Sequence, residues 1–345
     1  MSAMRPTASP LAIWAGLILL YVVWGSTYLG MKLAIETMPP FVMGVFRFIP
    51  AGLLLTGFVI ARHRGRLRRP KAREVIDAAI VGTVLLAGAT MLVGWAEQTI
   101  PIGVAAVIIA LVPMWLAILD RVFFRQPIGR FVGLGIVIGL AGVAILAWPV
   151  GGAGDLDPAG LAAVLVSPVL WAVGTLYAAR RAVLPGPALL ASGIEMTAAG
   201  LALIAIAALT GEWAAFDLAA VSTTSWAGIG YLIVMGSIVG YSTFAWLITV
   251  APMSRVSTYA YVNPVVAVLL GWLVLGEPLT MRTIVASAVI VVAVAIIVSA
   301  RSRPTKVAVR AAPGTTPSAS PAGRSGAADA PQVLATAEEA REPAA

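Results

Sequence analysis

Ten long apolar runs, separated by short polar connections, constrain this chain more than any other feature of its sequence. A membrane-spanning helix needs about 20 apolar residues, and the runs approach or exceed that length. Because lipid offers no hydrogen bonds, a continuous apolar run of this kind satisfies its own backbone as a helix. The runs occupy residues 11–33, 41–61, 75–96, 101–124, 130–149, 159–179, 187–209, 225–250, 256–275 and 283–300.

Composition excludes most soluble classes of protein. Of the 345 residues 60% are hydrophobic and 11% are charged, whereas an ordinary soluble domain is roughly 25% charged. The net charge of +8 would suit nucleic acid, but the basic residues lie mainly in connections and termini, where membrane topology explains them. The sequence therefore predicts an all-α polytopic membrane protein with the lipid bilayer as its surroundings and no nucleic-acid partner.

The sequence lacks the residues that most enzymes and metal sites need. It has no cysteine, and its one histidine, His63, lies in a basic connection. Metal sites and His-dependent acyl transfer both require such side chains. No phosphate-binding G-x-x-x-x-G-K-[ST] motif occurs, so ATP hydrolysis by that route is excluded. We therefore expect that the protein is not an enzyme and that it binds no metal ion and no cofactor.

The basic residues predict how the helices are oriented. Of the 23, all but Lys32, Arg47 and Arg282 lie at the termini or in alternate connections, most densely in 62–73 and 121–130. Lys and Arg concentrate in cytoplasmic loops, so these connections are predicted to face the cytoplasm. The same alternation places both termini there. We expect a multi-pass protein of the cell membrane, the inner or cytoplasmic membrane, with both ends in the cytoplasm.

The two halves of the apolar region match each other. Residues 95–127 align with 246–278 at an offset of 151, and Trp24 matches Trp171 at an offset of 147. The shared order of the matches indicates two five-helix repeats, residues 11–149 and 159–300; the alternative is chance similarity of apolar sequence. Because five is odd, the second repeat is inverted, as in many secondary transporters. Residues 302–345, rich in Ala, Pro, Gly and Ser, are predicted to be a disordered cytoplasmic tail.

Several short motifs occur in order along the chain: Trp24-Gly25-Ser26-Thr27-Tyr28, Pro39-Pro40 followed by Arg47-Phe48, Pro113, residues 261–267 (YVNPVVA) and Gly276-Glu277-Pro278-Leu279. They resemble those of the EamA-type proteins of the drug/metabolite transporter superfamily, most of all its YedA-type inner-membrane exporters. The resemblance implies ten helices in two inverted repeats, with a central cavity formed mainly by spans one, three, four, six, eight and nine. One departure is Gln126, where the second repeat has Glu277.

Charges inside or beside the spans are candidates for coupling or gating. A charge at the centre of a membrane helix costs about 2.5–3.5 kcal/mol on insertion scales, so it is retained mostly for function. Arg47 and Glu195 lie within spans two and seven. They either couple transport to a substrate or proton, or snorkel to opposite interfaces. Glu97, at the end of span three, is either a gate residue or a plain interfacial carboxylate.

Prolines and glycines indicate where helices bend and where they approach closely. Pro113 and Pro264, in spans four and nine, each free a carbonyl and predict a hinge or binding site, with a static kink as the alternative. The G-x-x-x-G match of Gly135 and Gly139 in span five fits internal packing better than a homodimer face, which stays possible.

Aromatic and small polar residues are the predicted walls of a substrate cavity. Large ring faces with a few hydrogen-bonding groups suit amphipathic or aromatic molecules, including organic cations, and the alternative is ordinary helix packing. The candidates are Trp24, Ser26, Thr27, Tyr28, Trp95, Trp171, Tyr177, Tyr241, Trp246, Tyr259, Tyr261 and Asn263.

Together these features predict a secondary active transporter that exports small metabolites or drug-like molecules by alternating access. Its partners would be a small-molecule substrate and a coupling proton. Charge lining a continuous pore would favour the alternative of a passive channel or facilitator, and the sequence shows no such rings. An antiporter for another solute class, such as phosphorylated solutes, would need several basic residues inside the spans, and Arg47 is the chief one.

Overall fold

The computed structural model describes residues 8–148 and 156–301, all within the compact unit Met1–Pro304. The predicted tail, residues 302–345, lies outside the described residues. Within the described ranges the chain forms helices and no strand, which confirms the all-α fold. Nine helical stretches are long and apolar enough to cross a membrane, and one shorter apolar helix completes the expected ten.

The helix boundaries lie within about three residues of the predicted runs. In several spans the helix is interrupted or changes type. The bounds are α1 (Pro10–Ala34), α2 (Pro40–His63), α3 (Ala72–Gly82), η1 (Thr83–Thr90), α4 (Met91–Ala96), α5 (Ile102–Ile109), α6 (Val112–Phe124), α7 (Arg130–Ala147), α8 (Pro158–Arg180), α9 (Ala188–Leu209), α10 (Glu212–Ala215), η2 (Leu218–Ala220), α11 (Thr223–Tyr231), η3 (Leu232–Val239), α12 (Gly240–Val250), α13 (Met253–Val256), α14 (Tyr259–Leu275) and α15 (Met281–Arg301).

Local capping explains where several helices begin. The first N–H groups of a helix have no partner in the helix itself, and a preceding Ser or Asp side chain supplies one. Ser9 accepts from the Ala12 N–H at 3.2 Å, and Asp157 accepts from the Gly160 N–H at 2.7 Å. Ser222 does the same for α11. These caps fix the entry points of α1, α8 and α11.

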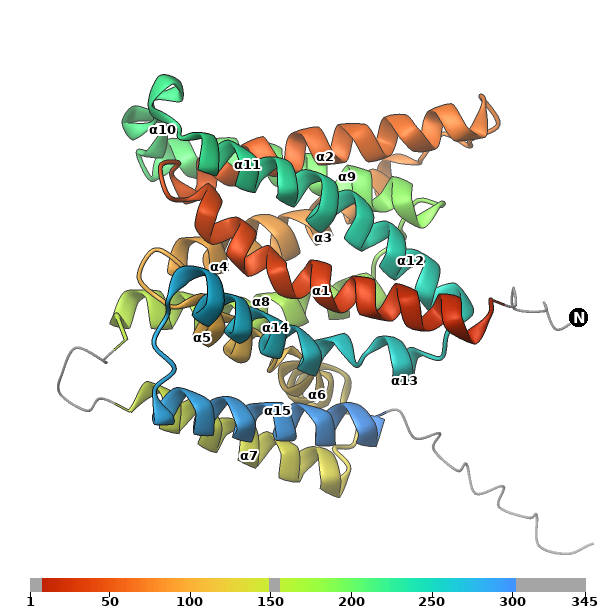
Figure 1. Cartoon of the computed structure of the whole chain (residues 1–345). Coiled ribbons are helices and arrows are strands. Elements are labelled where there is room, and N and C mark those ends of the chain that lie inside the picture. Colours follow the sequence, from red (N-terminus) through yellow and green to blue (C-terminus); the bar gives the residue numbers. More distant parts are fainter. Residues whose placement is uncertain (1–7, 149–155, 302–345) are drawn as a thin grey trace, which may run out of the picture. The chain divides into compact units, whose positions relative to one another are not determined.

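Helices at corresponding positions of the two repeats make corresponding contacts. Helix α2 packs on its equivalent α9, and α7 packs on its equivalent α15, which Figure 1 shows side by side. Helix α1 packs against α11–η3–α12 and against α14. We call all of these elements, α1 included, group I. The equivalent of α1 is α8, which packs against α3–η1–α4 and against α5–α6. We call these elements, α8 included, group II. The two groups therefore contain equivalent helices of the two repeats.

The connections divide the bundle into two ends. Residues 35–39, 97–101, 210–222 and 276–280 lie at one end, which we call the Glu97 face, because hydrogen bonds link them or the adjoining helix ends to one another. The opposite end, the Arg121 face, carries the connections at 64–71, 125–129, 181–187 and 251–258. There Asp120 pairs with Arg180 at 2.9 Å, and Asp77 accepts from the Val183 N–H at 2.8 Å.

Close approach between helices depends on glycine. A Cβ at Gly52 of α2 would lie 2.7 Å from the Gly193 carbonyl oxygen and 2.6 Å from the Thr197 nitrogen of α9. In α7, a Cβ at Gly135 or at Gly142 would come within 2.5 Å of a side chain of α15. The glycine stripe of span five therefore serves internal packing, one of the two alternatives that the sequence left open.

Helix irregularities differ from those predicted. The helix of span four breaks at 110–111, so Pro113 lies in the first turn of α6, where its missing N–H costs nothing. Pro264 lies inside a continuous α14, and the break in that region comes earlier, before Tyr259. The two prolines are thus not paired breaks. The paired irregularities are the π-helical segments η1 and η3, at equivalent places in the two repeats.

The contact between α2 and α9 generates a stability prediction. We expect Gly52→Ala to lower the stability of the protein by about 1–3 kcal/mol, because the added methyl group meets backbone atoms that cannot move independently. Gly57 in the same helix has open space around it, so Gly57→Ala should be neutral or stabilising through helix propensity alone. Thermal inactivation midpoints in detergent would compare the two variants. Equal midpoints would mean that the helices separate easily.

Candidate functional site

Five residues of the described chain bury side-chain polar atoms that have no hydrogen-bond partner. An unpartnered polar group in the dry interior costs free energy, so each one needs an explanation. Those with charged side chains are the most costly. The residues are Arg47 of α2, Glu97 after α4, Ser237 of η3, Asn263 of α14 and Ser287 of α15.

Arg47 lies inside the bundle rather than at its surface. It stands seven residues after the start of α2, which places it about 10 Å deep. Its side chain is buried, and the Nε and Nη1 groups have no acceptor. A Cβ at Gly236 of η3 would lie 3.6 Å from Arg47 Nη2 and 3.1 Å from the Thr27 methyl carbon of α1. Arg47 therefore faces group I, and the snorkelling interpretation does not describe this side chain.

Glu97 is also buried, which corrects its interpretation as a plain interfacial carboxylate. It is 0% exposed although it lies in a connection, and neither carboxylate oxygen has a hydrogen-bond partner. The Lys32 ammonium of α1 donates to the Glu97 backbone oxygen rather than to its carboxylate. Burial raises the pKa of the Glu97 carboxyl well above its ordinary value; the positive charges of Lys32 and Arg47 oppose this shift, and Glu277 adds to it.

Trp24 lies at the centre of an aromatic cluster in group I. Its ring centroid is 5.7 Å from that of Tyr241, 5.2 Å from that of Phe244 and 5.0 Å from that of Tyr259. These edge-on and tilted contacts are the arrangements that aromatic rings prefer. Nearby, the hydroxyl groups of Tyr21 and Thr258 hydrogen-bond to each other. Three predicted cavity residues are thus brought together, with Phe244 as an unpredicted fourth.

The small polar residues of α1 use their hydrogen bonds within the protein. Ser26 bonds to the Tyr231 hydroxyl at 2.5 Å and to the carbonyl of Val22. The Thr27 hydroxyl donates to the Trp24 carbonyl at 2.6 Å. In contrast, Asn263 leaves its amide oxygen buried and unpartnered. Of the predicted polar cavity residues, Asn263 therefore has the most capacity to bind a further group.

Other predicted cavity residues lie elsewhere. Tyr177 donates to Asp77 at 2.8 Å on the Arg121 face, and Trp246 is 38% exposed on α12 beside Gly16. Tyr28 and Tyr261 pack against two different hydrophobic clusters, and Trp95 and Trp171 are partly buried in α4 and α8. Glu195 is partly buried in α9, near its Arg121-face end, where its backbone meets Gly82; the described residues contain no ion pair between it and Arg47.

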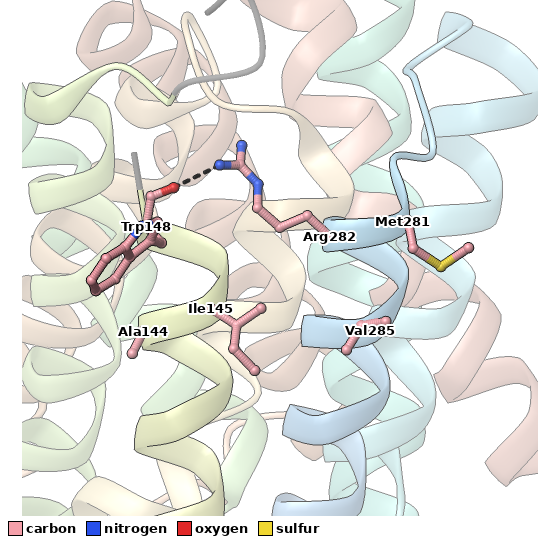
Figure 2. Close-up of a pocket in the computed structure, with 6 residues that line it drawn as sticks. All are labelled: Ala144, Ile145, Trp148, Met281, Arg282 and Val285. Carbon is pink, nitrogen blue, oxygen red and sulfur yellow. Dashed lines mark hydrogen bonds between the residues drawn. The ribbon is translucent and has the colours of Figure 1, made fainter. Parts of the chain in front are cut away.

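One surface groove lies away from these groups. It has a volume of about 480 Å³ and is lined by residues of α7 and α15 and by Trp148. Figure 2 shows Arg282 above this groove, donating to the Trp148 carbonyl oxygen at 2.7 Å. Its lining is apolar apart from this arginine, so it resembles a surface that contacts lipid more than a site that selects a solute.

Two carboxylates on the Glu97 face have roles that sequence reasoning missed. Glu277 accepts from the Ile102 N–H at 2.8 Å and from the Gly103 N–H at 3.4 Å. Glu212 accepts from the Phe41 and Val42 N–H groups at 2.8 and 3.1 Å. Each carboxylate caps the N-terminus of a helix whose preceding residue is a proline. The signal was present in Pro39-Pro40 and Pro101, which cannot cap a helix with their own side chains.

Comparison with known proteins agrees with this architecture. The EamA-like transporter family matches residues 12–148 and again residues 158–299. The chain is 36% identical over 289 residues to YedA, an inner membrane transporter of Escherichia coli K12, covering 83% of this chain and 90% of YedA. It is 28% identical over 290 residues to a chloroplastic WAT1-related protein of Arabidopsis thaliana, covering 81% of this chain and 68% of that protein.

A solved structure supports the fold. A crystal structure at 20% sequence identity aligns with a TM-score of 0.56 over 84% of this chain and 96% of that chain. The family match covers both halves of the helical region, and the YedA match spans most of it. The resemblance predicted from the motifs is thereby confirmed: the chain belongs to the EamA-like transporter family, a family of multi-pass membrane transporters rather than of enzymes.

Proposed function

We propose that this protein is a secondary active transporter that exports small metabolites or drug-like molecules by alternating access. The observation that carries the proposal is the pair of buried ionisable side chains, Arg47 and Glu97. Nε and Nη1 of Arg47 and both carboxylate oxygens of Glu97 have no hydrogen-bond partner. They belong to or adjoin helices that contact both repeat-related groups. An ionisable group kept buried in a membrane protein without a hydrogen-bond partner is a functional feature by default, because burying it costs free energy.

The chemistry of these groups suggests the kind of solute. Arg47 offers N–H donors, and Asn263 offers an acceptor. The aromatic cluster around Trp24 offers ring faces. A small amphipathic molecule with a hydrogen-bonding end and an apolar or aromatic body could bind both the polar groups and the aromatic rings. Antiport of a different solute class on the same fold is the alternative; a heavily anionic solute would require more basic residues beside Arg47.

A substitution at Arg47 tests the proposal. We expect Arg47→Met to reduce solute exchange in proteoliposomes at least tenfold while leaving thermal stability unchanged or raised. Removing an unpartnered buried charge relieves a desolvation cost, whereas a purely structural arginine would destabilise the fold when removed. Exchange of radiolabelled amino acids and cationic dyes across sealed vesicles would measure the first quantity, and a melting curve in detergent the second.

The control variant is Arg62→Met, at the solvent-exposed end of α2, which should retain exchange. Unchanged exchange in Arg47→Met would remove Arg47 from the transport site. Bulk conductance far above carrier rates in the wild type would instead favour a channel or passive facilitator, because alternating access moves solute only by exchange or along an imposed gradient.

Proton coupling gives a pH prediction. Since burial raises the pKa of Glu97, this carboxyl keeps its proton at a pH at which an exposed glutamate has lost it. Contact with water would return the pKa of Glu97 toward its ordinary value. At a pH between the ordinary and the raised pKa, that contact would release the proton. We expect Glu97→Gln to flatten the pH dependence of gradient-driven uptake in inside-out vesicles.

Glu195→Gln is the matched variant, because Glu195 lies toward the opposite face. If Glu195 is the coupling group, its substitution should abolish proton-driven uptake while Glu97→Gln leaves it intact. Retention of the full pH dependence in both variants would reassign both carboxyls to packing and show that the coupling proton binds elsewhere.

The orientation of the protein follows from its basic residues and belongs to the same proposal. We infer that the Arg121 face is cytoplasmic, the Glu97 face is external and both termini are cytoplasmic. Fusions of alkaline phosphatase and of a fluorescent protein at residues 5 and 301 should both report the cytoplasm. Reporter signals from opposite sides of the membrane would contradict an even number of spans.

A further inference from the structure

Among the described residues, three hydrogen bonds join group I to group II at the Glu97 face. The Lys32 ammonium of α1 donates to the Glu97 backbone oxygen after α4. The Ile102 and Gly103 N–H groups of α5 donate to the Glu277 carboxylate after α14, at 2.8 and 3.4 Å. Helices α5 and α14 also touch directly, since a Cβ at Gly103 would lie 3.1 Å from the Val268 Cα. The two groups are therefore held together at this end of the bundle.

The local sequence directs Glu277 toward α5. Gly276 adopts the left-handed conformation with φ 66°, which ends α14, and the Glu277 N–H donates to the Gly271 carbonyl at 3.0 Å. Pro278 then prevents the helix from resuming. Gly271 leaves room for the carboxylate, because a Cβ there would come within 2.3 Å of Glu277 Oε2. The side chain thus crosses from group I to the start of a helix in group II.

The need for this cap arises in α5 itself. Its preceding residue is Pro101, which provides no side-chain cap, so the first N–H groups of α5 lack a local acceptor. A carboxylate is the strongest acceptor available to them and is favoured by the positive end of the helix dipole. Helix α2 follows Pro39 and receives the same kind of cap from Glu212. Those bonds, however, join α2 to the segment that follows α9, the helix on which α2 packs most extensively.

We propose that Glu277 is a gating residue, whose carboxylate holds the Glu97 face closed by capping α5 from group I. The inference rests on the alternating access proposed above, in which the two groups separate at one face at a time. Opening of this face breaks the cap and exposes the α5 N–H groups to water. Lys32, which bonds to a backbone oxygen rather than a charge, is the weaker second contact of the same gate.

The opposite face has no charged equivalent of this residue. Gln126 occupies the matching place in the first repeat, and its N–H donates to the Asp120 carbonyl at 3.2 Å, as that of Glu277 does to Gly271. The Gln126 side chain is uncharged and exposed. The carboxylate latch is therefore specific to the Glu97 face, and its loss should shift the protein toward the state open at that face.

Spin-label distances test the latch without requiring a known substrate. The chain has no cysteine, so Glu36→Cys and Gln98→Cys introduce the only two labelling sites into the full-length protein. Both positions are exposed, one after α1 and one after α4. In reconstituted membranes, Glu277→Ala should raise the ratio of long to short distances by about 2- to 30-fold, the equilibrium equivalent of losing a helix cap. Glu277→Gln, which keeps an acceptor without charge, should give a smaller shift.

Glu212→Ala is the matched control, because it removes an equivalent cap that does not join the two groups. A shift in Glu277→Ala with none in Glu212→Ala supports the latch. An unchanged distribution in Glu277→Ala, or equal shifts in both variants, overturns it. Failure of the wild type to exchange any solute would count against the proposed function alone, since the distance measurement decides the latch independently.

Discussion

The absence of water inside the bilayer is the constraint on which the rest of this structure depends. Each apolar run becomes a helix because no other form satisfies its backbone there. Helices then associate through close contacts rather than through the hydrophobic effect, since lipid is as apolar as they are. Gly52 and Gly193 provide such a contact between α2 and α9, and the glycines of α7 provide another with α15. Polar groups left without partners are consequently rare and informative.

The repeat-related packing divides the helices by role. The pairs α2–α9 and α7–α15 each join a helix to its own equivalent, so they lie where the two repeats meet. The other membrane-crossing helices form groups I and II. Group I contains Trp24 with its aromatic neighbours, and Glu97 follows α4 of group II. Arg47 projects from α2 toward group I. Motion of one group against the other would change the surroundings of both charged residues.

Sequence reasoning predicted the spans well and the contacts less well. Apolar runs and prolines mark helix ends locally, so the ten spans begin and end near the predicted residues, whereas the breaks and π segments inside them were not predicted. The contact of Tyr177 with Asp77 joins positions 100 residues apart, and that of Glu277 with Ile102 joins positions 175 apart. No local pattern specifies such pairs. The π-helical segments η1 and η3 were also missed, because a single extra residue in a helical turn leaves apolar periodicity nearly unchanged.

The two turns that end α6 and α14 show how a duplicated backbone acquires unequal chemistry. In each turn a residue in the left-handed conformation, Arg125 or Gly276, ends the helix. The N–H of the next residue then donates to the carbonyl six residues earlier. Only the second turn carries a carboxylate, at Glu277, that reaches a helix start. In the proposed latch, only the Glu277 turn holds its face closed through such a bond. Under that proposal, the difference between the two turns favours the state closed at the Glu97 face at rest, whereas the direction of net transport would follow from the gradients across the membrane.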